Sequence, residues 1–94
     1  MDSVAPIKVN GTLIRSKPNM NHQPQLQELQ LALSENIRVL RGKRGLSQER
    51  LALEAGIDRT LVSKIERTIA NPTLGVLTKL AFVLEVPVIR LLKS

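Results

Sequence analysis

Residues 48–67 read QERLALEAGIDRTLVSKIER, and this stretch decides the fold. Its apolar residues recur at steps of three and four, which predicts two short helices with one apolar stripe each. The two stripes consist of Leu51, Ala52, Ala55, Val62 and Ile65. Gly56 lies between the helices, where a sharp turn needs the left-handed backbone conformation that glycine adopts without steric cost. Asp58 follows it, and its side-chain oxygen can cap the free amides at the start of the second helix.

The second predicted helix carries polar and basic residues on its outer face, with no carboxylate until Glu66. These residues are Arg59, Thr60, Ser63, Lys64 and Arg67. Two helices joined in this way are typical of a helix-turn-helix, whose second helix usually lies in the major groove of DNA. The alternative is a segment of an ordinary helical bundle. The small Ala52, then Gly56 and the branched Val62, at the positions that the motif requires, favour the helix-turn-helix.

Composition limits the kind of protein that this chain can be. Its 94 residues predict one small domain, and because Phe82 is the only aromatic residue, the core must be aliphatic. The net charge of +6 favours an acidic partner such as nucleic acid. The chain has no cysteine, which excludes disulfides and thiolate metal sites and fits a reducing cytoplasm. It also contains no apolar run near membrane-spanning length and no signal-peptide core, so we expect a cytoplasmic protein without a membrane contact.

The N-terminal residues 1–24 predict an arm that precedes the folded domain of residues 25–94. Pro6, Pro18 and Pro24 interrupt any helix there, and apolar content is low. Within the arm, Asn10-Gly11 is a preferred hairpin turn between β-prone flanks, residues 7–14. The arm is therefore either flexible or a short strand or hairpin that docks on a partner.

Three further helices are predicted around the central pair, which makes the protein all-α with five helices. The first starts near Gln25, although Ser34 could cap a later start, and its stripe is Leu26, Leu29, Leu33, Ile37 and Leu40. Ser47 is the expected N-cap of the second helix and Thr73 that of the fourth. The fourth helix should bury Leu74, Leu77, Leu80, Ala81 and Leu84. A short last helix follows Pro87, which is well tolerated in a first helical turn.

Three stretches together resemble a known family: NIRVLRGKRGLSQERLA, AGIDRTLVSKIER and NPTLGVLTKLAFVLEVP. They are similar to the five-helix DNA-binding domain of the lambda-repressor-like group. That group includes phage repressors, xenobiotic-response-element regulators and the controller proteins of restriction–modification systems. The resemblance extends from about Ile37 to Leu92, and the Asp-Arg-Thr start of the third helix is particularly like the controller proteins.

The resemblance implies roles for individual residues. Base edges would be read by Gln48, Arg59, Thr60, Ser63 and Lys64. Phosphates would be held by Lys43, Arg44, Ser47, Arg67, Asn71 and Thr73. Arg41 and Glu66 match a structural ion pair between the first and third helices. Among the base readers, Arg59 is the best candidate for a bidentate contact to guanine.

The predicted function is a sequence-specific transcriptional regulator, a repressor or autoregulator, that binds a pseudo-palindromic operator as a homodimer. The last helix has more apolar residues than it can turn inward, so the predicted dimer interface is Val88, Ile89, Leu91 and Leu92. The alternative is an antitoxin or another protein-interaction regulator whose arm, residues 1–24, binds a partner protein. An enzyme is disfavoured because the only histidine, His22, lies in the arm and no carboxylate pair is placed for catalysis. No cofactor or metal is expected.

Overall fold

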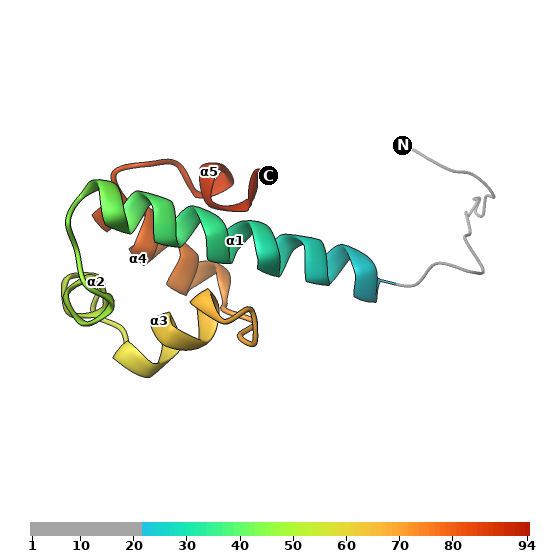
Figure 1. Cartoon of the computed structure of the whole chain (residues 1–94), viewed down its shortest axis with the longest axis horizontal. Helices are drawn as coiled ribbons and strands as arrows, with labels where there is room; N and C mark the ends of the chain where they lie inside the picture. Colours follow the sequence, from blue (N-terminus) through green and yellow to red (C-terminus); the bar gives the residue numbers. More distant parts are fainter. Residues whose placement is uncertain (1–21) are drawn as a thin grey trace.

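The computed structural model describes residues 22–94, which form five helices and no strand (Figure 1). The helices are α1 (Gln23–Lys43), α2 (Gln48–Ala55), α3 (Arg59–Glu66), α4 (Leu74–Leu84) and α5 (Val88–Leu92). The all-α prediction with five helices is therefore confirmed. The hairpin predicted within residues 7–14 lies outside the described residues. None of the helices within 22–94 is long and apolar enough to cross a membrane.

α1 is the longest element, and α3 and α5 pack against it. α3 packs on one side of α1 and α5 on another, while α2 contacts α3 and α4 (Figure 1). The helix begins at Gln23, two residues before the expected start, because Pro24 occupies the first turn, where its missing amide costs nothing. It passes through Ser34 without a break. Ser34 is therefore not a cap; it is buried and its hydroxyl donates to the carbonyl of Glu66 at 2.7 Å.

The core is aliphatic, as predicted, and joins all five helices. Its fully buried side chains include Ile37, Leu51, Val62, Ile65, Leu80 and Leu91. Two of the residues predicted for the buried apolar stripes of α1 and α4 are exposed instead. Leu29 on α1 keeps 41% of its surface exposed, and Leu74 at the start of α4 keeps 74%. Val83, which was not expected in the core, is buried instead of Leu74.

Local capping follows the sequence closely. The side chains of Ser47, Asp58 and Thr73 accept hydrogen bonds from the backbone amides of Arg50, Thr60 and Val76, so the three predicted N-caps are confirmed. Gly56 ends α2 with φ +70°, and the amide of Ile57 donates to the carbonyl of Ala52 at 3.0 Å. These caps satisfy the amides and carbonyls that short helices leave free. They fix the α2–α3 turn and with it the direction of α3.

Candidate nucleic-acid interface

α3 has one buried face and one open face. Val62 and Ile65 are buried in the core, whereas Arg59, Thr60 and Lys64 are exposed and Ser63 is partly exposed. The Arg59 side chain is 68% exposed, and its closest carboxylate, Glu49, lies 3.8 Å away with a side chain that is 74% exposed. An ion pair so open to water holds the arginine only weakly. Arg59 is therefore free to reach an incoming acceptor.

The one carboxylate of α3, Glu66, turns away from this face into the protein. It is 4% exposed, and Arg41 holds it with two hydrogen bonds, from Nε to Oε2 at 2.7 Å and from Nη2 to Oε1 at 3.0 Å. The Gln48 amide donates a third bond to Oε1 at 2.9 Å. Burial alone would raise the pKa of Glu66, but the hydrogen bonds from Arg41 and Gln48 and the charges of Arg41 and Arg38 lower its pKa overall. The same contact with Glu66 raises the pKa of Arg41.

The backbone at the end of α3 is tied to α1 by a second set of contacts. The carbonyl of Glu66 accepts hydrogen bonds from the Ser34 hydroxyl and from the Arg38 guanidinium. Arg41 also donates from Nη1 to the carbonyl of Leu46 at 2.8 Å, which joins the start of α2 to the same cluster. We call Ser34, Arg38, Arg41, Gln48 and Glu66 the Glu66 network. Because it connects α1, α2 and α3, the network fixes the orientation of α3 against the rest of the fold.

The residues expected to hold phosphates fall into two groups. All six are exposed: Lys43, Arg44, Ser47, Arg67, Asn71 and Thr73. Arg44 differs, because its Nη1 donates to the carbonyl of Val83 at 3.0 Å and lies 2.9 Å from the Glu85 carboxylate. Arg44 thus binds the C-terminal end of α4. Lys43, at the end of α1, stays exposed and is the cation there that can reach a phosphate.

The four residues predicted to form the dimer interface differ in their exposure. Ile89 is 72% exposed, whereas Val88 and Leu92 are partly exposed and pack against the core. Leu91 has no exposed surface at all. Its assignment to a subunit interface is therefore wrong, because on this short helix Leu91 is the side chain that turns toward α1 and the core.

Two features of the site were not predicted from the sequence. Gln48 was expected to reach a base, and in the structure its amide is bonded to Glu66. Ser34 was expected only as a possible cap, and it contributes to holding α3. Neither role has a local sequence signature, because the partners lie 18 and 32 residues away in the chain.

α2 and α3 are joined by a tight turn, and α3 exposes basic residues while the Glu66 network fixes its orientation. These features are typical of a helix-turn-helix of the DNA-binding class. Comparison with known proteins agrees: the family described as helix-turn-helix matches residues 37–91. The chain belongs to this helix-turn-helix family, whose members similar to it include a transcription factor and a control protein.

Three relatives illustrate the range of this similarity. A hypothetical transcription factor of Neisseria meningitidis is 42% identical over 69 residues, and its crystal structure superposes with a TM-score of 0.68 over 71% of this chain and 75% of that one. The control protein C.SmaI of Serratia marcescens is 43% identical over 60 residues, 64% of this chain and 71% of the relative. The structure of the restriction–modification controller protein C.AhdI of Aeromonas hydrophila is 37% identical, with a TM-score of 0.63 over 66% of this chain and 94% of that one. The matched part spans 65% of the Neisseria protein's full length.

Proposed function

We propose that this protein regulates transcription by binding a pseudo-palindromic operator as a homodimer, with α3 of each subunit in the major groove. The observation that carries the proposal is the difference between the two faces of α3. Arg59, Thr60 and Lys64 are exposed to solvent, while Glu66 is buried and bonded to Arg41. A buried carboxylate presents no repulsive charge to a phosphate backbone. Kinship with transcription factors and with controller proteins of restriction–modification systems supports the same function.

Base reading would depend mainly on Arg59. A guanidinium presents two parallel donors to O6 and N7 of guanine, a pattern that the other bases lack in the major groove. Thr60 offers a methyl group for thymine or a hydroxyl for a phosphate, and Ser63 and Lys64 lie one turn further along α3. Gln48 reaches a base only by leaving its bond with Glu66. We therefore assign Gln48 a minor role in base reading.

Phosphate contacts would flank the reading helix on both sides. Lys43 lies before α2, and Arg67, Asn71 and Thr73 lie after α3. Ser47 and Thr73 already accept a hydrogen bond from their own helix, but each hydroxyl keeps a proton that it can donate to a phosphate oxygen. Such contacts set register and supply affinity that depends on salt, without reading sequence.

A homodimer follows from the small amount of sequence that one α3 can read. Two copies related by a two-fold axis would contact half-sites roughly 34 Å apart on one face of the duplex. On α5, the exposed Ile89 and the partly exposed Leu92 are the apolar residues available for the subunit contact. A bound dimer would act as a repressor or autoregulator by occupying a promoter, in a bacterial or phage setting.

The experiment that tests this function is selection of bound sequences from a random pool of double-stranded DNA, with the wild type and Arg59→Ala in parallel. The wild type should enrich an inverted repeat whose half-sites contain guanine, and the variant should lose preference at one position of each half-site. Failure of the wild type to enrich any sequence, or an enriched site without two-fold symmetry, would contradict the proposal.

A further inference from the structure

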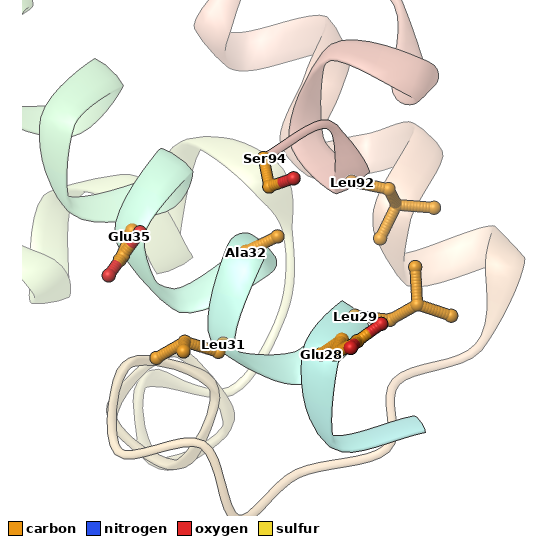
Figure 2. A pocket seen from close by; sticks show the side chains of 7 residues that line it. All are labelled: Glu28, Leu29, Leu31, Ala32, Glu35, Leu92 and Ser94. Atoms are coloured by element: carbon orange, nitrogen blue, oxygen red, sulfur yellow. The ribbon is translucent and has the colours of Figure 1, made fainter. Parts of the chain in front are cut away.

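An apolar groove lies between the N-terminal half of α1 and α5, away from α3. Its lining residues are Glu28, Leu29, Leu31, Ala32, Glu35, Leu92 and Ser94, around a volume of about 400 Å³ (Figure 2). Leu29 and Leu92 also line two adjoining hollows, one with Ile89 and Lys93 and one with Leu26 and Pro72. We call this surface the α1–α5 groove. In Figure 2 the Leu29 side chain, from α1, and the Leu92 side chain, from α5, lie next to one another.

The apolar side chains of this groove are more exposed than a monomer needs. Leu29 is 41% exposed, Leu31 54% and Ile89 72%, and they come from two helices that pack against each other. Single exposed leucines are ordinary, but a contiguous apolar surface with charged residues at its edge marks a site of protein contact. The part of α1 that contributes to the groove also precedes residue 37, where the match to the helix-turn-helix family begins.

The charges at the edge of the groove indicate what binds there. Glu28 and Glu35 line its α1 side, and Lys93 follows α5 on the other side. Within residues 22–94 none of these three charges has an ionic partner. Arg90 is different, since it donates to Oδ1 of Asn36 at 2.9 Å. When two copies of such a surface are related by a two-fold axis, the carboxylates on α1 of one copy can face the lysine after α5 of the other. The surface is therefore complementary to itself.

The size of α5 shows that it cannot form a stable interface alone. It has five residues, and Leu91 is buried in its own subunit. Stable protein interfaces bury about 800 Å² on each partner and involve about 20–30 residues a side. A homodimer that used only Ile89 and Leu92 would fall far short of that area. The adjoining face of α1 is the nearest apolar surface that can enlarge it.

We propose that the α1–α5 groove is occupied by the same groove of a second copy of this chain, so that α1 before residue 37 is a principal part of the dimer interface. Leu29 would lie near the two-fold axis, and Glu28 of each subunit would face Lys93 of the other. The apolar contact supplies affinity, and the charge pairs fix register, because exposed ion pairs add little stability. This inference rests on the proposed homodimer and names the surface that forms it.

The first test compares Leu29→Gln with Val39→Gln by sedimentation equilibrium. Both residues are on α1 with similar exposure, 41% and 50%, but Val39 does not line the groove. Leu29→Gln should raise the dimer dissociation constant by about 30-fold or more. A symmetric dimer contains two copies of Leu29, so the substitution removes two central apolar contacts. Val39→Gln should dimerise like the wild type. Equal dimerisation of Leu29→Gln and the wild type would overturn the proposal, as would an equal loss in the two variants.

The second test exchanges charges across the interface. Glu28→Lys and Lys93→Glu should each weaken the dimer several-fold at low salt, and the double variant should recover most of the loss. Both residues are exposed, so circular dichroism should show an unchanged fold. A double variant as weak as the sum of the two single changes would overturn the pairing of Glu28 with Lys93.

DNA binding measured on the same proteins separates this inference from the proposed function. Monomeric Leu29→Gln should bind a single half-site like the wild type and lose affinity only for the full operator. A wild type that stays monomeric with and without DNA would overturn the homodimer and this interface together. A wild type that dimerises through the groove but binds no duplex would contradict the proposed DNA function alone.

Discussion

The Glu66 network makes a quantitative prediction about stability. Glu66→Gln removes the negative charge but keeps the size of the side chain, so Arg41 retains at most one acceptor there. Removal of one partner from a buried ion pair costs about 3–5 kcal/mol. Because the Arg41 side chain is 22% exposed and can be hydrated, the lower end applies, about 3 kcal/mol of the free energy of unfolding. For a domain of this size that loss lowers Tm by about 12–24 °C.

The assay is urea denaturation of the wild type and Glu66→Gln between pH 7 and pH 3. The pKa of Glu66 is lowered from its ordinary value of 4.5, so its stabilising effect is complete above that value and disappears as pH falls through the lowered pKa. The two proteins should therefore differ fully at pH 7 and converge in acid. Other carboxyl groups titrate in both proteins and cancel from the difference.

Two control variants separate the effect of the Glu66 charge from that of side-chain packing. Glu49→Gln removes an exposed carboxylate beside Arg59 and should leave stability nearly unchanged. Arg41→Met combined with Glu66→Leu removes both charges and should be less destabilised than Glu66→Gln, because no buried charge is left unpaired. A loss for Glu66→Gln that is the same at pH 7 and pH 3 would show that packing, and not charge, accounts for the effect.

Three further predictions concern other parts of the fold. Arg59→Ala should cost about 1–3 kcal/mol on the selected operator and much less on random DNA, measured by fluorescence anisotropy; equal losses on both would contradict base reading. Lys43→Ala should weaken binding to all DNA alike and reduce the slope of log K against log salt by about one unit, a result that a residue away from phosphate would not give. Glu85 ends α4 with φ +62°, so Glu85→Gly should raise the free energy of unfolding by about 0.5 kcal/mol in thermal denaturation; a loss would show that its contact with Arg44 outweighs the backbone strain.

Local rules predicted the turn and the helix starts because the interactions that make them are local. The caps at Ser47, Asp58 and Thr73 each bond an amide two or three residues away, and Gly56 needs only its own backbone conformation. Residue types at fixed offsets are sufficient evidence for such contacts. The same locality explains why the five helices could be placed within a few residues.

Contacts between distant helices could not be predicted in this way. Lys43 and Arg44 are adjacent cations with the same apparent role in the sequence, yet only Arg44 meets the end of α4. Leu91 and Leu92 are likewise adjacent and apolar, and the position of α1 against α5 decides that Leu91 is buried. In both pairs the difference arises from which side of the backbone another element covers. The sequence therefore predicted the kind of site more accurately than the role of each residue in it.

α1 connects the two surfaces on which the proposed function depends. Its C-terminal half holds α3 through Ser34, Arg38 and Arg41, and its N-terminal half provides Glu28 and Leu29 to the α1–α5 groove. The eight residues of α3 are too few to form a stable helix alone, so its direction is determined by what holds it. A helix of 21 residues is about 31 Å long and rigid on that scale. If two copies meet through the groove, α1 sets the distance from the two-fold axis to each reading helix, and the spacing of the operator half-sites becomes a property of α1 and not of a flexible linker.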